Sequence, residues 1–385
     1  MNETVSIKFQ YPPSGYAIEI GQGPLMASGE WAKKCLGGKA GRVALVSNVK
    51  VFGLYGEALK SSLERANFDV FVCLIGDGEK YKNFKTLQKT LDNFSENRLS
   101  RTDAVVALGG GVVGDIAGFA ASIYLRGVSF LQIPTTLLSM IDSSVGGKTG
   151  INSSYGKNLI GSFYQPKGVL VDVQTLQTLP KRELTAGFCE AIKQGAISDR
   201  TLFEQTETFL KTHSTNNFGG KLADKGIVRD LVELISAQIA FKARIVANDE
   251  RESPDKSDAQ SRKILNFGHT FAHALERVTN YRYLKHGEAV GYGILFAAGL
   301  SKKLGLLAQN ELNLLNDVVH RAGILPPISN LDPRVVFETF KYDKKLINNS
   351  LQWILLESIG KPIIFPHSDI PQSALMSVFK DIAHS

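Results

Sequence analysis

The sequence DAVVALGGGVVGD at residues 103–115 joins a short apolar run to a glycine-rich turn. Glycines at 109, 111 and 114 form the pattern G-x-G-x-x-G, and apolar side chains then repeat at helical spacing through Ile116, Phe119 and Ile123. A strand–turn–helix unit of this kind is typical of dinucleotide-binding domains, because glycines let the backbone approach a pyrophosphate and the helix N-terminus offers it N–H groups. Taken alone, the motif is also compatible with a structural tight turn.

Other short apolar runs flank this motif, at 42–47, 70–75, 128–133 and 169–172. Helix-length segments separate them, which predicts an open parallel sheet with right-handed crossovers. Two details differ from an ordinary Rossmann domain: the glycine-rich turn lies beyond residue 100, and the first run ends at Asn48 and not at a carboxylate. We expect Asn48 to hydrogen-bond a cofactor ribose.

The pattern changes near Pro180, where proline and charge interrupt it. Residues 225–247, 266–278, 286–304 and 309–322 carry apolar side chains at helical spacing. The sequence therefore predicts an α/β, Rossmann-like N-terminal domain at 1–180 and a mainly α-helical C-terminal domain at 181–385.

Composition narrows the class of function. The net charge of +7 comes from 44 Lys and Arg against 37 Asp and Glu, and the basic residues are spread along the chain. Dispersed basic residues favour an anionic metabolite over a nucleic acid. No apolar run reaches the roughly 20 residues needed to span a bilayer, the first residues lack a signal-peptide layout, and the three cysteines have no paired spacing. We expect a cytoplasmic enzyme with no membrane partner.

Three of the seven histidines, His269, His273 and His286, fall within 18 residues. His269 and His273 stand at i and i+4, on one face of a helix, and spacing alone favours them as a ligand pair. The residue after His269 is Thr270 and not glutamate, which argues against a metalloprotease. A lone histidine is more often a structural imidazole, but a cluster of three favours metal binding or acid–base chemistry. Spacing does not identify a third ligand.

Five motifs taken together resemble the 3-dehydroquinate synthase family and the wider sugar phosphate cyclases. They are GGGVVGD at 109–115, PTTLLSMIDSSVGGKTGINSSYGKN at 134–158, GFCEAIKQG at 187–195, LNFGHTFAHALE at 265–276 and HGEAVGYG at 286–293. The resemblance covers nearly the whole chain, from Glu79 to Lys345. It implies conversion of 3-deoxy-D-arabino-heptulosonate 7-phosphate to 3-dehydroquinate and phosphate, by transient oxidation with NAD, phosphate elimination, re-reduction, ring opening and aldol closure. It also implies a homodimer.

The resemblance further implies that Glu190, His269 and His286 hold Zn²⁺ or Co²⁺, and that His273 belongs to the substrate shell. This assignment conflicts with the one that histidine spacing favours, and we follow the resemblance. It places NAD on Glu79, Lys82, Gly110, Gly111, Val112, Asp115, Thr135, Thr136, Asp142, Lys148, Lys157, Thr178 and Leu179. The substrate is expected on Lys148, Asn158, Lys193, Lys242, Arg262, Asn266 and Lys344 or Lys345, and on Arg126 from a neighbouring subunit.

Two other enzyme classes stay open. Another sugar phosphate cyclase would act on sedoheptulose 7-phosphate or glucose 6-phosphate, which lack a carboxylate. Lys242 and Arg262 suit a substrate with a carboxylate, and Glu288 is also found in the synthases, whereas Gln194 departs from their usual pattern. A metal-dependent alcohol dehydrogenase would have a different glycine-rich stretch where this chain carries Lys148. A catalytically dead binding protein is a further alternative, which the intact set of site residues disfavours.

Overall fold

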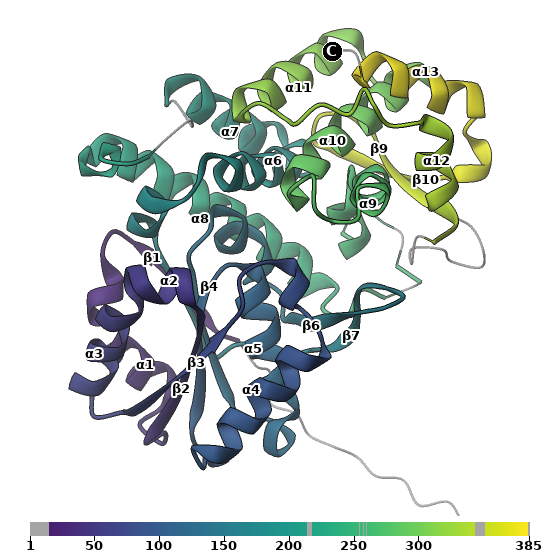
Figure 1. Cartoon of the computed structure of the whole chain (residues 1–385). Coiled ribbons are helices and arrows are strands. Elements are labelled where there is room, and N and C mark those ends of the chain that lie inside the picture. Colours follow the sequence, from purple (N-terminus) through teal and green to yellow (C-terminus); the bar gives the residue numbers. More distant parts are fainter. Residues whose placement is uncertain are drawn as a thin grey trace, which may run out of the picture.

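The computed structural model describes residues 15–213, 218–253, 255–256, 258, 260–342 and 351–383 (Figure 1). Its first part carries a six-stranded sheet in the order β1-β8-β5-β4-β2-β3, and every pairing in this sheet is parallel. The strands are β1 (Ala17–Gly21), β2 (Arg42–Asn48), β3 (Asp69–Ile75), β4 (Ala104–Gly109), β5 (Ser129–Pro134) and β8 (Gly168–Asp172).

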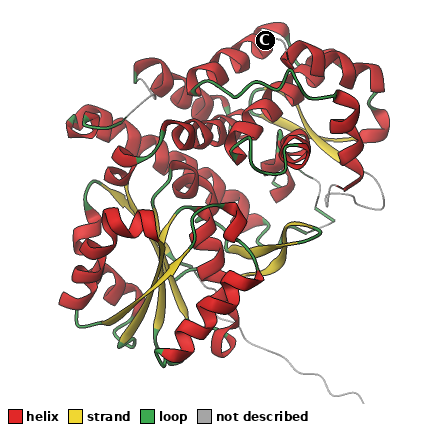
Figure 2. Cartoon of the chain, viewed as in Figure 1, coloured by secondary structure: helices red, strands yellow, loops and turns green. Residues whose placement is uncertain are grey.

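Helices cover both faces of this sheet (Figure 2). Val43 and Leu45 of β2 pack in a core with α1 (Ser28–Leu36) and α3 (Glu57–Arg65). Ala44 and Val46 pack in another core, with α4 (Phe84–Glu96) and α5 (Gly111–Ile123). β2, β4, β5 and β8 are almost wholly buried, and their sequences are continuous apolar runs. These four strands and the edge strand β3, which is also an apolar run, were predicted from the sequence; the other edge strand, β1, was not.

Two short hairpins were not predicted. β6 (Lys148–Ser153) pairs antiparallel with β7 (Gly156–Phe163), and β9 (Gln352–Ser358) pairs antiparallel with β10 (Lys361–Pro366). The first hairpin projects from the sheet-bearing part toward the helical part (Figure 1). It therefore brings Lys148, Lys157 and Asn158 to the boundary between the two.

The rest of the chain is mainly helical. Its helices are α6 (Lys181–Ser198), α7 (Arg200–Thr212), α8 (Lys225–Asn248), α9 (His269–Val278), α10 (His286–Lys303), α11 (Gln309–Ala322), α12 (Pro333–Glu338) and α13 (Gln372–Ala383), with the three-residue α2 (Val49–Val51) in the first part. α10 lies in the middle of this layer and contacts α6, α9, α11 and α13. One continuous core joins Val169 and Val171 of β8 to side chains of α6 and α8.

The four predicted helical segments are present, and the main difference is at 266–268, where a 3-10 turn (Arg262–Asn266) and Gly268 precede α9. No helix within the described ranges is long and apolar enough to cross a membrane.

Candidate active site

A cavity of about 1350 Å³ lies between the carboxyl ends of the parallel strands and the helical part. In open α/β sheets, ligands bind at this edge. The cavity is lined by nearly all of the residues that the sequence assigned to the site: Asn48, Glu79, Lys82, Gly110, Gly111, Val112, Asp115, Thr135, Thr136, Asp142, Lys148, Lys157, Asn158, Thr178, Leu179, Lys193, Lys242, Arg262, Asn266, His269, His273 and His286. Of the other assigned residues, Lys344 and Lys345 lie outside the described residues.

The glycine-rich turn forms an open cradle at the end of β4. Gly110 is the N-cap of α5, and no side chain caps that helix. A Cβ atom on Gly110 would lie 3.1 Å from Thr136, and one on Gly111 would lie 3.0 Å from the Ser143 hydroxyl. All four residues line the cavity, so side chains at 110 and 111 would crowd its wall beside the first turn of α5, where a pyrophosphate would bind.

Lys82 and Asp115 connect this cradle to the hairpin. The Lys82 ammonium, buried, donates hydrogen bonds to the carboxylate of Asp115 and the side-chain oxygen of Asn158. Asn158 has a φ of 55° and lies in the part of β7 where the register with β6 is irregular. The three side chains that the sequence placed separately thus form one hydrogen-bonded group.

Asn48 has a neighbour that the sequence analysis missed. Its amide nitrogen donates to Asp77 at 3.1 Å, and its side-chain oxygen accepts from the Val51 N–H at 2.8 Å. Asp77 follows β3, the strand beside β2, and lines the cavity. The carboxylate missing from the first strand is therefore supplied by the next strand, and the parallel order of β2 and β3 was the signal that could have found it.

Glu190, His269 and His286 come from three helices and converge. One ligand atom from each residue lies within 4.8 Å of those from the other two. Among the residues that the structure describes, no other group of three possible metal ligands is this close. His273 shares the face of α9 with His269, and their ring centroids are 5.6 Å apart, but His273 is outside this group. Histidine spacing favoured His269 and His273 as the ligand pair. The structure instead groups His269 with His286, the first residue of α10.

Both imidazoles present Nε2 to Glu190. His286 Nε2 lies 3.4 Å from Glu190 Oε1 and His269 Nε2 lies 3.8 Å from it. The Nδ1 atom of His269 lies 3.2 Å from the carbonyl oxygen of Phe267, an acceptor that fixes the ring. Two nitrogens and a carboxylate oxygen facing one point are a suitable donor set for Zn²⁺ or Co²⁺.

Glu190 is fully buried, and its two oxygens accept no hydrogen bond within the described part of the chain. The Lys193 ammonium lies 2.6 Å from Oε2, but not in hydrogen-bond geometry. Burial raises the pKa of Glu190, yet Lys193 and His286 outweigh burial and hold that pKa below its usual value. Burial lowers the pKa of His286, whereas Glu276 and Glu190 raise it, to about 10. Glu190 is thus a buried, ionised carboxylate whose oxygens make no hydrogen bond in the described part of the chain, which fits a divalent cation.

Two lysines and a carboxylate lie beside this centre. Asp142 Oδ1 is 2.9 Å from the Lys242 ammonium and 3.9 Å from that of Lys193. Gln194, the residue that departs from the family pattern, donates to the Ile141 carbonyl at 3.1 Å and approaches Asp142 at 3.4 Å. Burial lowers the pKa of Lys242 to about 8, although Asp142 raises it. The cluster can hold the anionic groups of a small substrate.

Glu252 is a second residue that the sequence analysis missed. It pairs with the Lys148 ammonium and accepts from the Asn266 amide at 3.4 Å. Arg262 donates to the carbonyl oxygens of Glu250 and Gly146 at 2.7 and 3.1 Å. These contacts hold one lysine, one arginine and one amide at the cavity wall. Glu252 has a φ of 53°, and no spacing in the sequence signals its position.

Arg126 is exposed and is not among the described residues that line the cavity of its own chain. It follows the exposed Leu125, and both residues have positive φ values, of 66° and 49°. The structure therefore presents this arginine outward, on the turn that follows α5.

Comparisons with known proteins agree with this geometry. Residues 72–186 match the family model described as 3-dehydroquinate synthase N-terminal, and residues 187–346 match that of 3-dehydroquinate synthase C-terminal. A 3-dehydroquinate synthase of Synechococcus sp. is 40% identical over 384 residues, covering 99% of this chain and 100% of the relative.

Two solved structures share the fold at 25% identity. A 2-deoxy-scyllo-inosose synthase complexed with carbaglucose-6-phosphate, NAD⁺ and Co²⁺ matches with a TM-score of 0.79 over 94% of this chain and 96% of that chain. A 2-epi-5-epi-valiolone synthase from Streptomyces hygroscopicus, with NAD⁺ and Zn²⁺ bound, matches with a TM-score of 0.83 over 98% and 99%. With two family models spanning residues 72–346 and a relative matched end to end, the chain belongs to the 3-dehydroquinate synthase family.

Proposed function

We propose that this chain is a 3-dehydroquinate synthase, a phosphate-eliminating cyclase of the shikimate pathway. The observation that carries the proposal is one cavity in which a dinucleotide cradle, a Glu–His–His group and a cluster of buried cations face each other. The substrate, 3-deoxy-D-arabino-heptulosonate 7-phosphate, carries a carboxylate, vicinal hydroxyls and a phosphate. The 40% identical relative of the same length is named for this activity.

NAD fits the cradle because the Gly110 and Gly111 positions leave room at the uncapped N-terminus of α5. A Zn²⁺ or Co²⁺ ion fits Glu190, His269 and His286 because the carboxylate lone pairs are buried and unused. When bound, NAD accepts and later returns a hydride, and the ion acts as a Lewis acid toward the substrate hydroxyls.

The cations of the cavity bind the anionic ends of the substrate. Lys193, Lys242 and Arg262 supply positive charge in a buried setting, where charge-assisted hydrogen bonds are strong. Lys148 and Asn266, held by Glu252 in this structure, can exchange that carboxylate for substrate oxygens. His273 and Asn158 complete the polar wall. We assign Lys344 or Lys345 to the phosphate.

The chain acts mainly by holding the substrate in register. Residues from both parts line the cavity, so ring opening and aldol closure occur in one place, and proximity of this kind can contribute about 7–11 kcal/mol. We further propose that residues 1–180 and 181–385 are separate domains with the site at their junction. We also propose a cytoplasmic homodimer in which Arg126 enters the site of the neighbouring subunit; three free thiols agree with a reducing compartment.

The test is phosphate release by purified protein with NAD and Co²⁺. 3-Deoxy-D-arabino-heptulosonate 7-phosphate, sedoheptulose 7-phosphate and glucose 6-phosphate are compared in parallel. We expect phosphate only from the first, with no accumulation of NADH at 340 nm, because the hydride returns within each turnover. Release from one of the other sugars alone would assign the chain to a different cyclase. Net NADH formation would identify a dehydrogenase.

A further inference from the structure

Glu276 is a buried carboxylate that the mechanism above does not use. It lies near the end of α9, and 2% of its side chain is exposed. A carboxylate buried to this degree costs several kcal/mol unless cations or hydrogen bonds compensate it. Its partners therefore indicate what it does.

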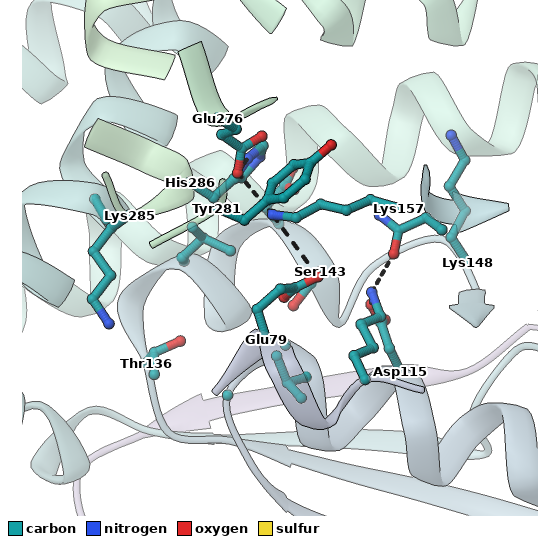
Figure 3. Close-up of a pocket in the computed structure, with 18 of the residues that line it drawn as sticks. Glu79, Asp115, Thr136, Ser143, Lys148, Lys157, Glu276, Tyr281, Lys285 and His286 are labelled. Atoms are coloured by element: carbon teal, nitrogen blue, oxygen red, sulfur yellow. Dashed lines mark hydrogen bonds and ion pairs between the residues drawn. The ribbon is translucent and has the colours of Figure 1, made fainter. Parts of the chain in front are cut away.

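One oxygen of Glu276 contacts both a lysine and a histidine. Oε1 lies 2.9 Å from the Lys157 ammonium and 3.4 Å from His286 Nδ1. Lys157 belongs to the hairpin β6–β7 of the sheet-bearing part, whereas Glu276 and His286 belong to the helical part. Figure 3 shows Glu276 beside His286, with a dashed line that joins it to the Lys157 ammonium.

The contact with Nδ1 determines which nitrogen of His286 faces the metal group. With Nδ1 directed at Glu276, Nε2 faces Glu190 at 3.4 Å. His269 has the same arrangement, except that its Nδ1 acceptor is a backbone carbonyl. A carboxylate acceptor fixes the ring and makes the opposite nitrogen a stronger metal ligand.

The contact with Lys157 extends this group toward the cofactor cradle. The Lys157 ammonium lies 3.9 Å from Glu79 and 4.5 Å from the centre of the Tyr281 ring. Glu79 lines the same cavity and accepts from Asn152 of the hairpin at 2.7 Å. A continuous series of contacts thus runs from Glu79 through Lys157 and Glu276 to His286.

We propose that Glu276 is a positioning residue that orients His286 for the metal and joins it, through Lys157, to the cofactor-binding part of the chain. The inference rests on the proposed function, because it takes Glu190, His269 and His286 as the metal ligands. It adds a residue to that site and a physical connection between its two cofactors.

The first test measures Co²⁺ binding to metal-free protein. Glu276→Gln keeps the shape and one acceptor oxygen but removes the charge, and Glu276→Leu removes both. We expect the Co²⁺ dissociation constant to rise about 10- to 100-fold in Glu276→Gln and further in Glu276→Leu. The visible absorption of bound Co²⁺ should also change, which altered packing far from the ligands would not cause. Glu207→Gln, which removes a lysine-paired carboxylate on α7, is the matched control and should bind like the wild type.

The second test measures NAD affinity with and without Co²⁺ by calorimetry. If Lys157 and Glu276 connect the sites, each ligand pre-orders the other's residues, and Co²⁺ should tighten NAD binding about 5-fold or more in the wild type. The ratio should fall toward one in Glu276→Gln. The control Glu207→Gln should keep the wild-type ratio.

The outcomes separate this inference from the proposed function. A wild-type protein that binds no Co²⁺ would refute the metal site itself. If folded Glu276→Gln and Glu276→Leu keep the wild-type Co²⁺ affinity, Co²⁺ spectrum and effect of Co²⁺ on NAD binding, only the role of Glu276 is refuted. The proposed function would be unaffected. A weakened Co²⁺ site with unchanged coupling would refute the connection through Lys157. Circular dichroism establishes that each variant is folded.

Discussion

The Lys242 ammonium is almost completely buried beside Asp142, with 6% of the residue exposed. Burial lowers its pKa to about 8, so the lysine loses its positive charge as the pH rises through that value. The profile of kcat/KM reports ionisation in the free enzyme. We expect kcat/KM to fall about tenfold per pH unit above pH 8, because only the charged lysine attracts the anionic substrate.

Lys242→Met is the comparison for this prediction. It should have a lower kcat/KM at pH 7 and no decline near pH 8, since its side chain does not titrate. If the decline near pH 8 persists unchanged in Lys242→Met, another group causes it.

The sequence predicted most of the residues that line the cavity, but it did not predict all of the contacts between them. Histidine spacing favoured His269 and His273, because a helix places i and i+4 on one face. The structure instead groups His269 with His286 and with Glu190, which comes from 79 residues earlier in the chain. Local periodicity cannot report a contact made by packing three helices. Glu252 was missed for the same reason, since tertiary contacts alone bring it to the site. Asp77 follows β3 beside Asn48, and the parallel order of β2 and β3 could have indicated it.

Among the elements, α5 and the turn before it offer a test of the cradle. A Cβ on Gly111 would lie 3.0 Å from the Ser143 hydroxyl, at the edge of the space left for the pyrophosphate, whereas one on Gly114 would meet Gln132 at an ordinary 3.4 Å. Gly111→Ala should therefore weaken NAD binding about tenfold, which corresponds to about 1.4 kcal/mol. Gly114→Ala is the matched control in the same helix turn. Equal NAD affinities by calorimetry would place the pyrophosphate elsewhere.

The elements that escaped prediction share a physical feature. The hairpin β6–β7 is rich in glycine and polar residues, so its sequence has the composition of a loop. Its glycines are required by the close approach of its strands: a Cβ on Gly161 would lie 2.0 Å from the Thr149 carbonyl oxygen. The four inner parallel strands, β2, β4, β5 and β8, are in contrast buried on both faces, and their sequences are continuous apolar runs. The inner strands could be predicted because their burial requires continuous apolar sequence. The strands of the hairpin contact each other without such a run, so the sequence does not reveal them.

For the whole molecule, the position of Arg126 leads to a prediction about subunits. Arg126 is exposed beside the exposed Leu125, and it is expected to act in the neighbouring site. Arg126→Asn and His269→Ala should each be inactive as homodimers; asparagine suits the φ of 66° at this position. In a heterodimer of the two, the site with an intact His269 receives Arg126 from its partner. That site should work, while the other lacks both residues.

Co-expression with two affinity tags and tandem purification isolates the heterodimer. Its phosphate release should reach about half of the wild-type rate, since one site of two is complete in a symmetric dimer. Were Arg126 to act within its own chain, each site would lack one required residue and the heterodimer would be inactive. If no doubly tagged species is recovered, the two chains do not associate, which would contradict the homodimer. Arg126 would then have no neighbouring site to enter.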